Sequence, residues 1–486
     1  MPQNYAIMGN KDKKTPVNYK EDTMNRRVWK VALITLLILG MLPLFAACSE
    51  KVPEEMEFQL VGDGSSYGVR MDEDYYLSEL VIPSKYKGKP VTEILPEAIE
   101  SAPNLEKVVI PSSIEKIGKD AFSGCKELET VCISDLDAWF AIEFESDTSN
   151  PLFYGADLLL NDEPVTSVTL PDDMTEVPDY LFRGCKSLTS VTVPEGVTSI
   201  GKSAFNACTS LVTVKLPSSL KTVEAHAFGS CEKLKLESLP AKLSQIGDHA
   251  FSHCTRFTAV EISARNVNIG RYAFSDCKKL TTFTLSGNNA HFADYAFSGC
   301  EKLTTFTLTG DDASFGSEVF NECYGLTTIS IFGDGLHFPK HSRPFFYHSN
   351  ALTTVHLPGN VTDNYNKLFE GCSKLESVTF GENFEIIGHG MFWDCTSLQE
   401  IELPAGAKVI EDFAFAGCTA LTKLYLPNSI TKIGSFLFSG CETLPTVYFD
   451  GTKAEWDAIE KEDLIGYGET LTVHCNDGIV TVTDTW

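Results

Sequence analysis

The sequence is poor in basic residues. It contains 39 Lys and Arg but 66 Asp and Glu among 486 residues, a formal net charge of −27, and no long basic block offsets the acidic excess. Such a surface would repel nucleic-acid phosphates rather than neutralise them, so the composition argues against a nucleic-acid partner. Hydrophobic residues make up 43% of the chain, which is enough to bury a core and excludes a disordered protein.

Motifs for catalysis or metal binding are also missing. The sequence has no C-x-x-C pair and no H-E-x-x-H signature. Four histidines lie close together in the second half, but their spacing fits no metal template: His337, His341, His348 and His356. We therefore expect no catalysis, no metal and no cofactor.

One short string points the other way. Residues 196–203 read GVTSIGKS, which fits the G-x-x-x-x-G-K-[ST] pattern of phosphate-binding loops. A true loop of this kind follows a buried strand and opens a long helix. Here residues 201–203 occupy a place that recurs in other parts of the chain, as residues 118–120 (GKD) and 270–272 (GRY). The recurrence predicts a repeated turn, with a variable and exposed pair after the glycine, and no nucleotide site.

The N-terminal region predicts export. A positive segment, Met24–Lys30, is followed by an apolar run, Val31–Ala47, and then by Cys48. The run is at the short end for a membrane span and has no basic flank after it, so a cleaved secretory signal fits better. The cysteine after Ala-Ala resembles a bacterial lipobox, which implies that Cys48 is lipidated. We expect residues 1–47 to be a leader and lipoprotein signal peptide, with Met24 as the true start. The product would be lipid-anchored at the cell envelope and exposed at the surface.

A 23-residue repeat dominates the rest of the chain. Residues 271–285 read RYAFSDCKKLTTFTL, and residues 294–308 read DYAFSGCEKLTTFTL. Cysteines keep the same period in two runs: Cys185, Cys208, Cys231, Cys254, Cys277, Cys300 and Cys323, then Cys372, Cys395, Cys418 and Cys441. A fixed period with L-x-x-[VIF]-x-[LI] is the signature of a leucine-rich solenoid, in which stacked units share one core.

The sequence pattern of each unit predicts one strand and one turn. In residues 303–308 (LTTFTL), apolar and hydroxyl residues alternate as in a half-buried strand. We expect an α/β repeat of about fifteen units over residues 80–450, with a parallel β-sheet on one face and short helical or 3-10 turns on the other. An insertion near 134–161 is expected to project as a helix and loop without breaking the stack. Residues 48–79 would form a tether and N-terminal cap, and 451–486 a C-terminal cap.

The units resemble the BspA-like leucine-rich repeat family. Residues 110–133 (IPSSIEKIGKDAFSGCKELETVCI) and 426–449 (LPNSITKIGSFLFSGCETLPTVYF) are similar to that family's pattern, and the resemblance covers most of residues 80–450. It implies a secreted or surface-anchored protein, since several members are adhesins for host glycoproteins or other cells. By that resemblance we expect an adhesin-like protein that binds extracellular proteins or glycans. A structural surface spacer and a glycan-capture protein of a nutrient uptake system are the alternatives.

Two interpretations of the recurring cysteines are open. The export signal permits disulfides, and stacked slots about 5 Å apart would satisfy the Cα distance for a bridge. Neighbour pairing, however, would leave Cys125 beside Ala102 and Asp162, which fill the same slot. A small, buried side chain explains this pattern better, so we favour reduced cysteines in the core.

The outward face of the strands is the expected binding surface of a solenoid. One outward position per unit gives a hydroxyl-rich middle and an aromatic C-terminal end: Thr284, Thr307, Ser330, His356, Thr379, Glu402, Tyr425 and Tyr448. Tyrosine is favoured at interfaces because it offers apolar area with a polar tip. A solvated, Thr-rich sheet that binds nothing is the alternative. A second candidate is the loop around the histidine-rich segment, with Phe345 and Tyr347 as contact residues.

Overall fold

The computed structural model describes residues 56–71, 76, 78–100, 102–236, 238–338, 345–346, 349–359, 366–461, 463–465 and 469–483. These residues belong to one compact unit, Glu55–Trp486. The predicted signal peptide and Cys48 lie outside the described residues.

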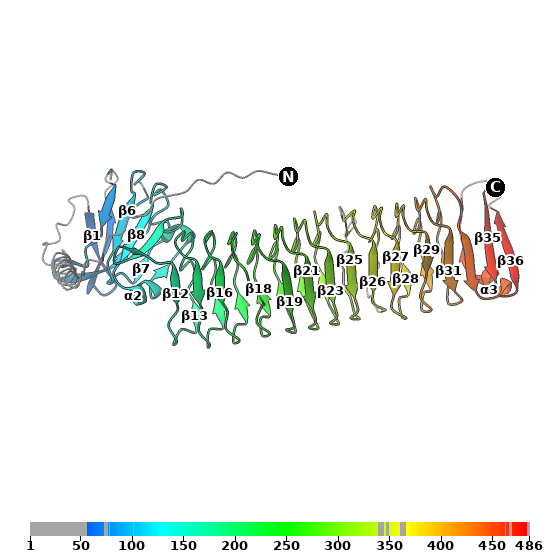
Figure 1. Cartoon of the computed structure of the whole chain (residues 1–486), viewed down its shortest axis with the longest axis horizontal. Coiled ribbons are helices and arrows are strands. Elements are labelled where there is room, and N and C mark those ends of the chain that lie inside the picture. The colour runs from blue at the N-terminus through cyan, green and yellow to red at the C-terminus, as the bar shows by residue number, and fades with distance from the viewer. Residues whose placement is uncertain are drawn as a thin grey trace, which may run out of the picture. The chain divides into compact units, whose positions relative to one another are not determined.

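Parallel strands stacked side by side form the main face of the repeat region (Figure 1). Neighbouring strands are offset by one repeat, so that Phe283 of β21 lies opposite Phe306 of β23. Residues along these strands alternate between half-exposed and buried. The predicted parallel sheet is confirmed. The strands of the main face are β3 (Glu79–Val81), β6 (Lys107–Ile110), β8 (Thr130–Ile133), β10 (Asp157–Leu160), β12 (Ser167–Thr169), β14 (Ser190–Thr192), β16 (Thr213–Lys215), β19 (Ala259–Ile262), β21 (Thr282–Leu285), β23 (Thr305–Leu308), β25 (Thr328–Ile331), β26 (Thr354–Leu357), β27 (Ser377–Phe380), β29 (Glu400–Glu402), β31 (Lys423–Pro427), β33 (Thr446–Asp450) and β35 (Thr470–Cys475).

A second row of parallel strands, most of them two residues long, runs along another side of the units. These are β5 (Lys89–Ile94), β7 (Lys116–Ile117), β9 (Glu143–Phe144), β13 (Glu176–Val177), β15 (Ser199–Ile200), β17 (Thr222–Val223), β18 (Gln245–Ile246), β20 (Asn268–Ile269), β22 (His291–Phe292), β24 (Ser314–Phe315), β28 (Ile386–Ile387), β30 (Val409–Ile410), β32 (Lys432–Ile433) and β34 (Glu460–Lys461). The remaining elements are β1 (Met56–Val61), β2 (Ser66–Met71), β4 (Lys85–Tyr86), α2 (Leu136–Phe140), η1 (Asp147–Ser149), β11 (Glu163–Pro164), α3 (Lys453–Ala458) and β36 (Gly478–Thr483).

The Ala-Phe-x-x-Cys segments are turns, so the helical or 3-10 turns expected on the second face are not confirmed. In one such segment, Tyr272 and Asp276 have φ angles of 54° and 55°. Residues in this left-handed region cannot continue a right-handed helix. The N–H of Phe274 donates to the carbonyl of Ala296 in the next unit, 2.8 Å away. Much of the backbone pairing therefore runs between units.

Phenylalanine rings stack through the interior of the repeats. Phe205 and Phe228 lie 5.2 Å apart between centroids, with their planes 6° from parallel. Phe274 and Phe297 are 5.5 Å apart at 5°. All four rings are fully buried. Identical rings on successive units let one core continue along the array, because no unit could bury its apolar edges alone.

Cysteine side chains line the core beside these rings. All described cysteines are unpaired, and most are buried. The Sγ of Cys208 donates to the carbonyl oxygen of Phe182 in the preceding unit, 3.0 Å away, and burial raises the pKa of this thiol well above its usual value. Cys254 makes the same bond to Phe228 at 3.3 Å. The slot therefore holds a small side chain that also satisfies a buried carbonyl group.

The insertion near 134–161 does not project from the stack, contrary to expectation. Its strand β9 pairs with β7 in the second row, and β10 pairs with β8 on the main face. Trp139 of α2 is 1% exposed, and its Nε1 donates to the carbonyl of Leu181, 3.2 Å away. Leu158 of β10 is fully buried. Burial of these large apolar side chains favours packing within the stack over projection into water.

The main sheet is interrupted at three places in the described chain. β11 turns back antiparallel on β10, and β12 starts the next sheet. Between β16 and β19 a single bridge joins Thr213 to Lys235. Glu237, which follows this bridge in the sequence, lies outside the described residues. β27 and β29 also belong to different sheets.

Other elements cover both ends of the described repeats. The β1–β2 hairpin continues onto β5 of the second row, and β4 pairs antiparallel with β5. At the other end, Trp456 of α3 packs edge-on against Phe449, with the centroids 5.6 Å apart. β36 pairs antiparallel with β35. These elements shield the apolar edges that terminal units would otherwise expose.

Candidate functional site

The predicted outward residues lie in two rows on the main face. The first row, aligned by the strand register, is Thr284, Thr307, Ser330, His356 and Thr379. The second row is Glu402, Tyr425, Tyr448 and His474. The interruption between β27 and β29 separates the two rows. The structure thus groups the predicted residues and adds His474, which falls outside the 23-residue period and shows only the strand alternation of TLTVHC.

The first row is polar, and two of its side chains, His356 and Thr379, are hydrogen-bonded to each other. Nδ1 of His356 lies 2.8 Å from Oγ1 of Thr379. The imidazole also packs on the ring of Phe332, with centroids 4.6 Å apart, and burial lowers the pKa of His356. Phe332 itself remains 56% exposed. The first row therefore presents hydroxyl groups and one exposed aromatic ring.

Three residues of the second row, Tyr425, Tyr448 and His474, form a column of stacked rings. Tyr425 and Tyr448 are 5.0 Å apart at 16°, and Tyr448 and His474 are 5.2 Å apart at 26°. Each of these side chains is half-buried. Tyr448 is covered on both sides, and His474 lies opposite Ile479 of β36, so Tyr425 is the ring of the column with an unstacked face. The free face of Tyr425 is on the side of β29, where Glu402 is aligned with it.

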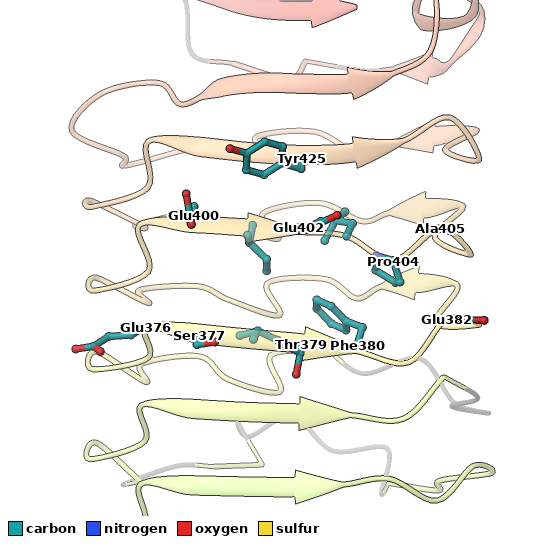
Figure 2. A pocket seen from close by; sticks show the side chains of 13 residues that line it. Glu376, Ser377, Thr379, Phe380, Glu382, Glu400, Glu402, Pro404, Ala405 and Tyr425 are labelled. Atoms are coloured by element: carbon teal, nitrogen blue, oxygen red, sulfur yellow. The ribbon is translucent and has the colours of Figure 1, made fainter. Parts of the chain in front are cut away.

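Two hollows lie over this part of the face. The first, of about 580 Å³, is lined by Glu376, Ser377, Val378, Thr379, Phe380, Glu382, Glu400, Ile401, Glu402, Leu403, Pro404, Ala405 and Tyr425 (Figure 2). The second, of about 490 Å³, is lined by Glu402, Leu403, Ala405, Tyr425, Leu426, Pro427, Tyr448, Phe449, Asp450, His474, Cys475 and Asn476. Four residues are common to both: Glu402, Leu403, Ala405 and Tyr425. We call the joined hollows the outer-face groove.

The groove begins where β27 and β29 are not paired. In Figure 2 the labelled residues of the first hollow come from both strands, with Tyr425 on β31 beyond them. Four carboxylates line this hollow: Glu376, Glu382, Glu400 and Glu402. Neither hollow has a Lys or Arg among the described residues that line it. The nearest basic partner is Lys423, whose Nζ lies 3.4 Å from Oε2 of Glu400.

In the predicted contact loop, the side chain of Phe345 is buried and is not available for binding. This side chain is 9% exposed, and its ring packs edge-on against Phe338 and Phe346, with both centroid distances 4.8 Å. The three extra residues of this unit place one more ring in the core instead of at the surface. Tyr347, together with two of the four histidines, lies outside the described residues.

The string GVTSIGKS is a repeat turn. A Cβ on Gly201 would lie 2.5 Å from Oδ1 of Asp179, so glycine is needed for the close approach of the preceding unit. The N–H of Lys202 donates to the same Oδ1, 2.7 Å away, and its Nζ lies over the ring of Tyr180. Ser203 is 2% exposed, contrary to the exposed position predicted for it, and its N–H donates to the carbonyl of Ala225 in the next unit. The backbone donors of this turn are thus used between units.

The described residues include neither a metal-binding cluster nor a membrane-spanning helix. Among the described residues, no group of three or more His, Cys, Asp or Glu side chains is arranged to hold a metal ion. None of the helices in the described part of the chain has the length and apolar character required to cross a membrane.

The fold and the repeat pattern define a leucine-rich-repeat solenoid. The family model for the BspA type leucine rich repeat region (6 copies) matches residues 75–138, 156–255, 230–342 and 340–458, which together exceed half of the chain. The chain belongs to this family. No curated protein matched the sequence.

One solved structure supports the same architecture, and a second has a lower structural similarity. A leucine-rich repeat protein from Bacteroides ovatus is 24% identical, with a TM-score of 0.56, over 85% of this chain and 100% of its own. A leucine rich cell surface protein from Faecalibacterium prausnitzii is 21% identical, with a TM-score of 0.33, over 85% of this chain and 97% of its own. The first likeness supports the fold assignment, and identity at this level does not carry function.

Proposed function

We propose that this chain is an adhesin-like binding protein of the cell surface, which recognises extracellular proteins or glycans through its main face and performs no catalysis. The outer-face groove is the observation that carries the proposal. It combines an aromatic column, four carboxylates and a concave shape on the exposed side of a rigid sheet. Solenoids of this kind bind through their extended surfaces, and tyrosines are frequent anchors of interfaces.

The proposed location rests on the N-terminal sequence. The positive segment, the apolar run and Cys48 are consistent with export and lipid anchoring at the cell envelope. The acidic composition suits a soluble body held outside the cell, because a net charge far from zero limits self-association.

A binding screen tests the proposal. The chain without its first 54 residues, which retains the compact unit Glu55–Trp486, would be presented to extracellular-matrix proteins, plasma glycoproteins and a glycan array. We expect at least one saturable partner whose binding is weakened by Tyr425→Ala. A structural spacer would bind nothing, and this outcome would contradict the proposal. Saturable binding confined to free oligosaccharides would favour the glycan-capture alternative.

A further inference from the structure

We propose that the outer-face groove binds an extended peptide segment that carries arginine or lysine side chains. This inference rests on the proposed binding function and deepens it by naming the chemistry of the partner. It is carried by three features of the groove: the sign of its charge, the position of Tyr425 and its length.

The charged side chains that line the groove are acidic, and the one printed ion pair at its edge, Lys423 with Glu400, leaves Glu402 without a basic partner among the described residues. Glu376, Glu382, Glu400 and Glu402 are all exposed side chains that line the first hollow, and Asp450 lines the second. An anionic glycan would be repelled by this surface. A neutral oligosaccharide would gain hydrogen bonds but nothing from the charge, whereas a guanidinium or ammonium group gains both. Charge complementarity therefore selects a cationic partner.

Tyr425 adds an aromatic face beside the carboxylates. One side of its ring is covered by Tyr448, and the other is directed towards β29, where Glu402 occupies the aligned position. Figure 2 shows the Tyr425 ring over the first hollow, next to the strand that carries Glu400 and Glu402. A cationic side chain at this point is attracted by the ring and by the carboxylate together.

The length of the groove fits a short extended segment. Its lining residues come from β27, β29, β31, β33 and β35 and the turns that follow them. The four paired strands β29, β31, β33 and β35, about 4.8 Å apart, span about 14 Å, and β27, which is not paired with β29, extends the groove by at least one more strand spacing to about 19 Å. An extended chain covers this length with about six residues. A segment of that size with basic side chains at alternate positions can contact both hollows.

A peptide titration tests the inference. The probe is a fluorescein-labelled nonapeptide of alternating serine and arginine, and its control has citrulline in place of every arginine. Fluorescence anisotropy at 0.05 and 0.3 M NaCl would measure the dissociation constant for the chain that starts at Glu55. We expect the arginine peptide to bind more tightly than the citrulline peptide, and Glu402→Gln to weaken its binding about tenfold. Tyr425→Ala should weaken it as well, with the thermal unfolding of each variant measured as a check of folding.

A matched variant separates the groove from the overall charge. Glu261 of β19 is exposed on the same face, pairs with Thr284, and does not line the groove. Glu261→Gln removes the same charge and should leave the affinity unchanged. Equal losses in Glu402→Gln and Glu261→Gln, equal binding of the citrulline peptide, or no binding of either peptide would overturn the inference.

The two proposals can fail separately. The binding screen could find a partner whose affinity is unchanged by Tyr425→Ala and Glu402→Gln. The chain would then be a binding protein, but the groove would not be its site for basic peptides. A neutral oligosaccharide that competes with such a partner while the arginine peptide does not bind would have the same meaning. If no screened partner binds but the arginine peptide binds with the expected dependence on Glu402, the groove inference stands and the adhesin-like role falls.

Discussion

The Sγ atom of Cys277 donates a hydrogen bond to the carbonyl oxygen of Phe251, 26 residues earlier, across 3.3 Å of buried space. The same bond recurs along the array, for example from Cys300 to Phe274 and from Cys418 to Phe392. In these units the cysteine side chain thus bonds to the backbone of the core phenylalanine in the unit before. This relationship makes the slot testable by substitution.

Ser349 is the exception that provides the test. It fills the cysteine slot of its unit and is fully buried, and its Oγ has no hydrogen-bond partner within the described part of the chain. A buried hydroxyl without a partner costs about 1–3 kcal/mol. We expect Ser349→Cys to raise the free energy of unfolding by about 1 kcal/mol in urea titrations. The reverse change at a matched site, Cys277→Ser, should lower it, and a loss of stability in Ser349→Cys would contradict this account of the slot.

The turn at residues 196–203 predicts opposite outcomes for two nearby variants. Phe205 is fully buried in the ring stack, so Phe205→Ala should reduce the free energy of unfolding by about 3–5 kcal/mol. The Lys202 side chain is exposed and contacts the Tyr180 ring, so Lys202→Ala should cost less than about 1 kcal/mol. Isothermal titration with ATP and Mg²⁺ should show no binding to either the native chain or Lys202→Ala. ATP binding that disappears in Lys202→Ala would restore the phosphate-loop interpretation.

Two stacked histidines predict an acid-sensitive stability. His226 and His249 have ring centroids 4.7 Å apart, and burial lowers the pKa of both. Asp248 opposes this shift at His249, and Arg271 adds to it. Because the folded pKa lies below the unfolded one, the unfolded chain binds protons first as the pH falls. The free energy of unfolding should therefore decrease from about pH 6.5 down through the folded pKa and then level off.

A single substitution separates this effect from general acid denaturation. Tyr272 is the residue of the next unit that corresponds to His249, and its ring stacks on the His249 ring. His249→Tyr therefore keeps an aromatic ring in the stack and removes one titrating group. We expect the variant to lose less free energy of unfolding than the native chain between pH 7 and pH 5, measured by urea unfolding at each pH. An unchanged pH slope in His249→Tyr would show that the stacked pair does not set the acid sensitivity.

The anchoring proposal predicts a modified cysteine. We expect Cys48 to be the N-terminal residue of the mature protein and to carry acyl chains, because it follows the apolar run and Ala-Ala. Mass spectrometry of the protein isolated from its native membranes would measure this directly. Cys48→Ser should release the protein from the membrane fraction. An intact N-terminus at Met1 or Met24 would refute the prediction.

The sequence was a good guide where the repeat itself decides the structure. The 23-residue period led to the parallel sheet and to the alignment of Tyr425 with Tyr448, because residues one period apart take the same place on successive strands. The period did not predict the groove. Residues 376–380 (ESVTF) and 399–403 (QEIEL) both fit the strand pattern, yet β27 and β29 are not paired. Strand pairing depends on how two units meet, which a pattern within each unit does not report.

Other differences arise where a segment departs from the period. The extra residues before Ser349 suggested an exposed loop, but Phe345 instead fills space in the core. The insertion that contains Trp139 offered no repeat signal, and its strands are formed only because both sheets provide edges for pairing. The turns after the second strands contain left-handed residues such as Tyr272, which side-chain spacing alone does not distinguish from a helical turn.

The second row of strands determines how much each interruption of the main sheet matters. β17, β18 and β20 pair across the boundary between β16 and β19, and β28 pairs with β30 across the boundary between β27 and β29, whereas both rows break between β11 and β12. In a one-dimensional array the total stability is the sum of the units and of the interfaces between them. The β11/β12 boundary is therefore where strand pairing joins the units least, and a tensile load along the array would separate it there first, with the repeats on either side still folded.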